Sequence, residues 1–212
     1  MSTETVSALS ELRMLYGTPP VDSLAVRCVL PHLDKHHRAF ISLSPFVVIG
    51  STDAQGSSDV SPRGDLPGFV AVLDDHTLLL PDRPGNKKLV TLGNILENSS
   101  VAFIFFVPGR NESLRVNGRA KITTDSALLG PLSVQGKSPR SAMIVTVEQA
   151  WFHCGKALIR SRLWDTEAKV TLDALPTLGK MLADQIGGVD AAQADARLED
   201  ANKNKLWGDV SS

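Results

Sequence analysis

The central part of the chain, residues 45–154, is a series of short β-rich segments separated by turn-forming residues. FVVIGS at 46–51 is followed by the turn DAQG, and GFVAVL at 68–73 is joined to TLLLP at 77–81 by DDH. Connections this short join antiparallel neighbours, whereas parallel strands need crossovers of about a dozen residues or more. The pattern therefore favours a small antiparallel barrel over a doubly wound α/β sheet.

Three further segments complete the expected sheet. SVAFIFFVP at 100–108 is apolar on both faces and predicts a central strand, and ESLRVNGRAKIT at 112–123 alternates as a long paired strand does. AMIVTVEQAWFHC at 142–154 predicts the last strand. Between them, KKLVTLGNILEN at 87–98 carries apolar residues at helical spacing. We expect a mainly β fold of six or so strands with one inserted helix.

Helices are expected on both sides of this barrel. One spans 7–16, a second begins after Asp22, and a third spans 32–42; Leu175 to Ile186 predicts a C-terminal helix, and 155–164 a short helix or turn. The inward face expected for the third helix is Leu33, His36, His37, Phe40 and Ile41. We therefore expect a single domain with an N-terminal helical segment (1–44), a barrel core (45–165) and a C-terminal helical, polar extension (166–212).

Composition excludes several functions. The chain has 22 basic and 23 acidic residues, which gives no large basic field for nucleic acid. Its apolar runs are shorter than the about 20 residues that a membrane span requires. Cys28 and Cys154 form no metal-like pair, and the acidic N-terminus lacks the features of a secretory signal. We expect a cytoplasmic protein with reduced thiols.

DVSPRGDLPGF at 59–69 is the first candidate site. A hydroxyl from Ser61, the forked donors of Arg63 and the open backbone of Gly64 could together hold a phosphate. A plain surface turn is an equally good interpretation of these residue types.

Asn86, Lys87 and Lys88 stand at the start of the helix predicted over 87–98. Backbone N–H groups converge at a helix N-terminus and favour an anion there. Basic side chains are unfavourable at that end of a helix unless an anion is bound, so this placement favours an anion site over a solvated basic face.

Two further groups come from later segments. Arg115 and Asn117 alternate with apolar neighbours, so Arg115 faces away from Leu114 and Val116, into solvent or a ligand cleft. WFHCGKALIRSRLW at 151–164 offers aromatic and basic side chains that could stack on a ring and bind anionic groups.

Other chemistries have weaker support. His153 and Cys154 are adjacent on a strand and point to opposite faces, so they are not expected to form a catalytic dyad. His32, His36 and His37 lack a third ligand nearby in sequence, and no metal is expected. No GxxxxGK[ST], GxGxxG or GxSxG motif occurs.

SPRGD, PDRPGN with two following polar or basic residues, and ESLRVNGRA occur in this order, and the likeness that they carry spans about residues 20 to 165. Together they resemble the pyridoxamine 5'-phosphate oxidase-like flavoproteins, in particular a bacterial branch of that family. The resemblance implies an FMN-binding split barrel that forms a homodimer, with each FMN bound non-covalently in a groove between subunits. The cofactor-binding residues that it implies are Ser61, Arg63, Asp82, Arg83, Asn86, Lys87, Lys88, Arg115 and Trp164.

The activity that this resemblance implies is an FMN-dependent oxidoreductase acting on a small organic substrate, with NAD(P)H as a candidate electron donor. The C-terminal block with which pyridoxamine 5'-phosphate oxidases hold their substrate phosphate is missing, so vitamin B6 oxidation is not expected. The alternatives are a relative that uses deazaflavin or heme, and a non-catalytic flavin-binding or sensor protein. No catalytic residue is assigned.

Overall fold

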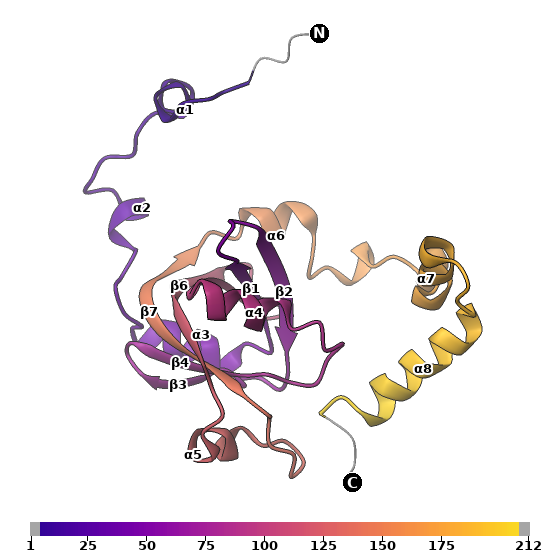
Figure 1. Ribbon diagram of the computed structural model, residues 1–212. Coiled ribbons are helices and arrows are strands. Elements are labelled where there is room, and N and C mark those ends of the chain that lie inside the picture. The colour runs from indigo at the N-terminus through magenta and orange to yellow at the C-terminus, as the bar shows by residue number, and fades with distance from the viewer. Residues whose placement is uncertain (1–4, 208–212) are drawn as a thin grey trace.

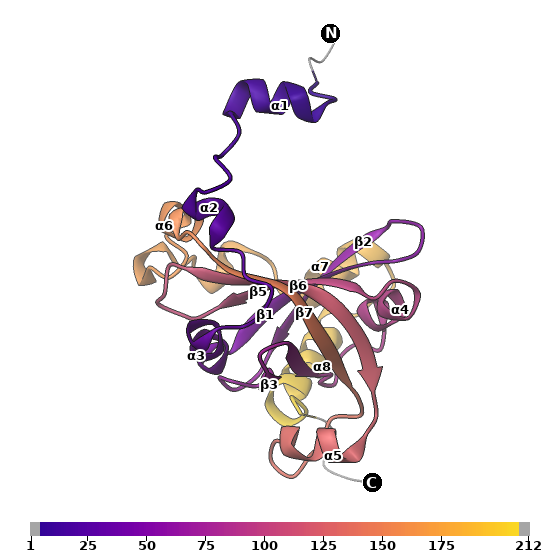
Figure 2. The same cartoon turned by 90° about the vertical axis from the view of Figure 1, so that its left-hand side faces the viewer.

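A computed structural model describes residues 5–207, and the parts of the expected terminal segments that fall on 1–4 and 208–212 lie outside it. The core is a seven-stranded antiparallel sheet in the order β2-β1-β5-β6-β7-β4-β3, which curls into a split barrel (Figures 1 and 2). The strands are β1 (Phe46–Thr52), β2 (Ser58–Gly64), β3 (Ala71–Asp74), β4 (Thr77–Pro81), β5 (Ser100–Phe106), β6 (Ser113–Thr123) and β7 (Ala142–His153). The expectation of a mainly β fold is confirmed.

The inner face of the sheet forms the hydrophobic core. In register, Ile49 of β1 pairs with Phe103 of β5, and Phe103 pairs with Val116 of β6. All three are buried, whereas Ile104 on the opposite face is only partly covered. The central position of β5 agrees with its apolar sequence, because its neighbours β1 and β6 cover both of its edges.

A β-bulge interrupts the pairing of β6 with β7. Asn117 pairs with Gln149 and Gly118 with Val147, so the backbone of Glu148 is skipped in the register with β6. A Cβ atom built on Gly118 would lie 2.1 Å from the carbonyl oxygen of Thr146. The close approach of the two backbones at the bulge therefore requires glycine at position 118.

Two predicted helices begin later than expected. α3 (Lys35–Leu43) begins after Asp34, whose side chain accepts the His36 and His37 amides in a capping box. His37 faces inward as predicted, but the prediction for His36 is wrong, because His36 is exposed on the other side of the helix. The helix predicted over 87–98 is α4 (Val90–Glu97), which begins at 90 because Lys87 and Leu89 have left-handed backbone angles.

The remaining helices lie outside the barrel. α1 (Leu9–Tyr16) and α2 (Leu24–Arg27) form an arm that stands away from the sheet, and α7 (Leu178–Ile186) packs on α8 (Ala191–Asn204) at the other side of the molecule (Figure 1). The short segment at 155–164 contains α6 (Lys156–Ser161). The sequence patterns did not predict α5 (Ser126–Leu129) and the 3₁₀ turn Gly130–Leu132. Within residues 5–207, no helix has the length and apolar character needed to cross a membrane.

Candidate functional site

Ser61 and Arg63 lie on the inner side of the edge strand β2. Ser61 pairs with Ile49 and Arg63 with Val47, and both of these β1 residues point into the core. The alternation of a strand therefore places Ser61 and Arg63 on the face that α4 covers. Neither side chain points to the outer surface of the sheet, as a plain surface turn would require.

Helix α4 is fixed over this face by two polar contacts. The Thr91 hydroxyl donates to Oδ2 of Asp59 on β2 at 3.2 Å, and the Asn94 amide donates to the hydroxyl of Ser51 at 3.0 Å. Thr91 is buried in the first turn of the helix. The N-terminus of α4 is thus held beside β2 and its inward-pointing polar side chains.

Arg63 has donor capacity that the protein does not use. Its Nε is buried and has no hydrogen-bond partner among residues 5–207, and its Nη2 lies 4.0 Å from Oδ1 of Asp82. Burial raises the pKa of the Asp82 carboxyl, and the charge of Arg63 opposes that rise. A buried, unsatisfied guanidinium nitrogen is uncommon in proteins and is readily satisfied by an anionic ligand.

Asn86, Lys87 and Lys88 form the loop that enters α4, and all three are exposed. The Asn86 side chain accepts the Lys88 amide at 3.1 Å, which orders the loop locally. Leu89, the N-cap residue of α4, supplies no side-chain cap to the first N–H groups of the helix. The loop therefore presents two ammonium groups next to an uncapped helix N-terminus.

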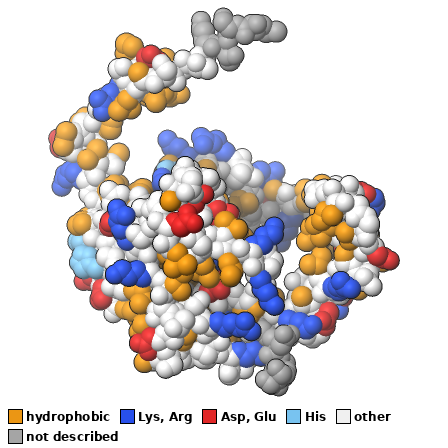
Figure 3. Space-filling view, viewed as in Figure 1, with side chains coloured by type: hydrophobic (Ala, Val, Ile, Leu, Met, Phe, Trp, Pro, Cys, Tyr) orange, Lys and Arg blue, Asp and Glu red, His pale blue; other side chains and the backbone are white. Residues whose placement is uncertain are grey.

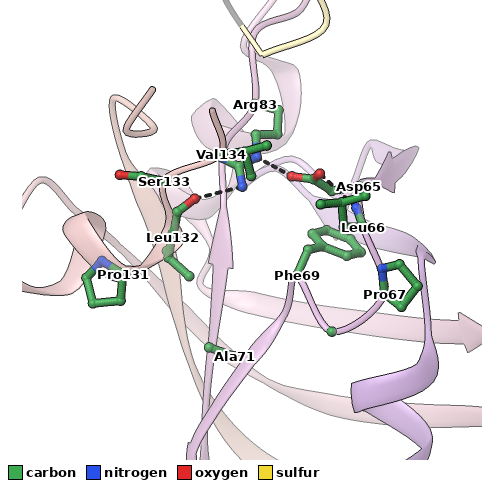
Figure 4. A pocket seen from close by; sticks show the side chains of 11 residues that line it. Asp65, Leu66, Pro67, Phe69, Ala71, Arg83, Pro131, Leu132, Ser133 and Val134 are labelled. Atoms are coloured by element: carbon green, nitrogen blue, oxygen red, sulfur yellow. Dashed lines mark hydrogen bonds and ion pairs between the residues drawn. The ribbon is translucent and has the colours of Figure 1, made fainter. Parts of the chain in front are cut away.

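Arg83 has a different environment from Arg63. Its Nε donates to Oδ2 of Asp65 at 2.5 Å, and its Nη2 donates to the Leu132 carbonyl at 2.8 Å (Figure 4). This ion pair lies at the edge of a hollow of about 230 Å³, whose other walls are mostly apolar residues of the loops 66–71 and 131–134. Arg83 therefore joins three separate segments of the chain.

Arg115 faces away from Leu114 and Val116, as their alternation predicted, and the register of the sheet places it on the outer face. Its guanidinium stacks over Trp151 at 4.7 Å from the ring centroid, and with His153 it borders an open apolar hollow of about 270 Å³. Trp164 lies elsewhere and donates its indole N–H to the Arg110 carbonyl at 2.8 Å. Within one chain, neither residue shares a face with Arg63.

Sequence reasoning did not single out Asp65 or Trp207. Asp65 is the last residue of SPRGD, and its side chain is 1% exposed in the ion pair with Arg83. Its Oδ1 also accepts the indole N–H of Trp207 at 2.9 Å. A carboxylate directly after a basic motif was the available signal for Asp65, but no local pattern connects residues 65 and 207.

The fold is a split β-barrel, and its candidate site places basic side chains between an edge strand and a helix N-terminus. The sequence profile of the pyridoxamine 5'-phosphate oxidase family matches residues 33–154, more than half of the chain. The protein belongs to this family. The matched range contains the whole barrel and ends before α6, so α1 and the C-terminal extension fall outside it.

Solved structures with a similar fold include a HupZ variant from Group A Streptococcus, with 19% identity and a TM-score of 0.48 over 57% of this chain and 99% of HupZ. A proposed pyridoxamine 5'-phosphate oxidase from Lactobacillus delbrueckii has 21% identity and a TM-score of 0.44, covering 57% and 95%. A protein related to general stress protein 26 from Clostridium acetobutylicum has 13% identity and a TM-score of 0.43, covering 56% and 86%. A comparison with curated proteins gave no match.

Proposed function

We propose that the protein binds FMN non-covalently and acts as an oxidoreductase on a small organic molecule, as a homodimer with NAD(P)H as a candidate electron donor. One observation carries the proposal: the buried, unpartnered Nε of Arg63 lies on the face that the uncapped N-terminus of α4 covers. A terminal phosphate would satisfy both groups at once. Membership of the pyridoxamine 5'-phosphate oxidase family supports a flavin as the molecule that carries this phosphate.

The residues around Arg63 and the N-terminus of α4 have separate roles in this proposal. Arg63 and the open amides of α4 hold the phosphate, and Lys88 neutralises its second charge; Ser61 and Asn86 add hydrogen bonds at either side. Asp82 lies 4.0 Å from Arg63, and we assign it to the rest of the cofactor next to the phosphate. Bound FMN supplies hydride and electron transfer, while the protein supplies orientation and exclusion of water.

The outer face of the sheet supports a dimer. Val60 is 69% exposed and Phe46 is 39% exposed there, next to the apolar hollow that Arg115 borders. Such a patch is costly on an isolated monomer. We assign Arg115 and its stacking partner Trp151 to the subunit contact, and Trp164, as the family resemblance implies, to the cofactor groove between subunits.

The test is the visible absorption spectrum of the purified protein, followed by heat release and mass spectrometry of the released cofactor. Flavin bands and released FMN support the proposal, and light scattering then measures the oligomeric state. A colourless protein that also refuses added FMN overturns it. A released deazaflavin or heme would replace FMN, and bound FMN without NAD(P)H oxidation would favour a non-catalytic flavin-binding role.

A further inference from the structure

The carboxylate of Asp65 is a buried junction between three distant parts of the chain. Its Oδ2 accepts Nε of Arg83 at 2.5 Å, while its Oδ1 accepts the Leu66 amide at 2.7 Å and the Trp207 indole at 2.9 Å. The side chain is almost completely shielded from water. A buried charge is tolerated only while its lone pairs are satisfied, so each of these three donors helps to hold the Asp65 carboxylate in its buried position.

The junction fixes the start of the loop that leads to α4. Arg83 follows Asp82 directly, and its second contact, to the Leu132 carbonyl, ties the loop to the segment after α5. Further along the loop, Lys87 and Leu89 have φ values of 60° and 57°, which are unfavourable for residues other than glycine. The loop therefore depends on contacts outside itself to keep this conformation.

Trp207 reaches the junction from a segment that the family match does not include. The chain leaves the barrel after β7, passes through α6, α7 and α8, and returns so that Trp207 meets Asp65, 142 positions away in sequence (Figures 1 and 2). α7 and α8 pack chiefly on each other, and Gly179 donates its amide to Asp195 at 2.7 Å within that pair. In the space-filling view, apolar side chains gather on this helix pair across from basic side chains of the barrel (Figure 3).

From this arrangement we infer that Trp207 is a positioning residue, which holds Arg83 in place through Asp65. The conformation of residues 82–89, and with it the retention of cofactor, therefore depends on the C-terminal extension. The role in cofactor retention rests on the proposed function, whereas the effect on the loop does not. Removal of the indole N–H leaves one lone pair of a buried carboxylate without a donor. This should raise the fraction of molecules in which the contacts of Asp65 are broken about tenfold.

The test compares Trp207→Phe, which keeps an aromatic side chain but removes the indole N–H, with Lys203→Met, which breaks an exposed ion pair with Glu199 on α8. Hydrogen exchange with mass spectrometry is measured on the cofactor-free proteins over residues 65–69 and 82–90. We expect about tenfold faster exchange in these two segments in Trp207→Phe, with β6 unchanged, and no change in Lys203→Met. FMN titration of the same proteins should give about a tenfold higher Kd for Trp207→Phe only.

Wild-type exchange over 82–90 in Trp207→Phe would overturn the inference, whether or not the protein binds FMN. Faster exchange there with an unchanged Kd would overturn the role in cofactor retention. Faster exchange throughout the sheet would overturn the inference that Trp207 positions the loop, because Trp207 would then support the whole fold. If the wild-type protein binds no FMN, the proposed function fails, and the exchange comparison still decides whether Trp207 fixes the loop.

Discussion

Nη2 of Arg63 lies 4.0 Å from Oδ1 of Asp82, so the edge strand β2 and the residue that follows β4 meet across the candidate anion site. This separation is too long for a direct hydrogen bond. The carboxylate therefore influences Arg63 through its charge without occupying the donors of the guanidinium. Those donors remain available to a ligand that enters between β2 and α4.

The first prediction concerns FMN affinity. Arg63→Ala removes two charge-assisted donors and should raise the Kd for FMN about 10- to 100-fold, measured by quenching of flavin fluorescence. Arg119→Ala is the matched control, because Arg119 is an exposed arginine on β6 that pairs with Glu148. An unchanged Kd in the double variant Arg63→Ala, Lys88→Ala would remove the phosphate assignment.

Asp82 predicts a pH-dependent effect on stability. Burial raises the pKa of its carboxyl above the ordinary value of 3.8, so the folded state favours the protonated form. The stability that it contributes is present below pH 3.8 and is lost as the pH rises through the folded-state pKa. Asp82→Asn should therefore raise Tm relative to wild type at pH 7, and this gain should shrink toward pH 3.8. A gain that is independent of pH would contradict the mechanism.

The titration of His37 should make stability depend on pH in the opposite direction. Burial lowers the pKa of its imidazole below 6.5, and the charge of Asp34 only partly opposes that shift. The neutral ring accepts a hydrogen bond from the Asp34 amide at 3.2 Å and packs against Phe152 with the two rings tilted. The free energy of unfolding should therefore fall as the pH drops below 6.5. Urea melts between pH 7.5 and 5 measure how the free energy of unfolding changes with pH. This change should be smaller in His37→Gln than in wild type, and equal to wild type in His36→Gln, a variant of the exposed neighbour.

Two glycines offer a matched pair of substitutions. Gly118→Ala would bring a Cβ against the backbone of β7 and should destabilise the protein by about 1–3 kcal/mol or more. A Cβ added at Gly93, inside α4, would meet no packed neighbour within 4 Å among residues 5–207, so Gly93→Ala should stabilise the protein by about 0.5–1 kcal/mol. Thermal unfolding followed by circular dichroism measures both. Equal effects of the two substitutions would show that backbone contact at the bulge is unimportant.

Much of the fold was accessible from local sequence pattern, because alternation and turn residues act over only a few positions. β5 and β6 follow their predicted ranges closely. The start of α4 was missed because hydropathy carries no information about the left-handed angles at Lys87 and Leu89. The range 126–132 was missed because a four-residue helix and a three-residue 3₁₀ turn are too brief for a periodic signal.

The candidate site depended on relationships that no local pattern contains. Alternation placed Arg115 opposite Leu114, but which of the two faced the core required the register of the whole sheet. Both Arg63 and Arg83 were expected at the cofactor site, yet Arg63 retains an unpartnered Nε within residues 5–207 and Arg83 is held by Asp65. The contact between Asp65 and Trp207 joins segments whose separation exceeds any motif.

The bulge opposite Gly118 sets the parity of side-chain direction along β7. Before the bulge the odd-numbered residues Val145 and Val147 point inward, and beyond it the even-numbered Ala150 does so. The single additional residue Glu148 therefore directs Trp151 to the outer surface, where it meets Arg115. In a regular strand with the same residues and no bulge, the odd-numbered Trp151 would continue the inward set of Val145 and Val147, and the outer face would lose its aromatic platform.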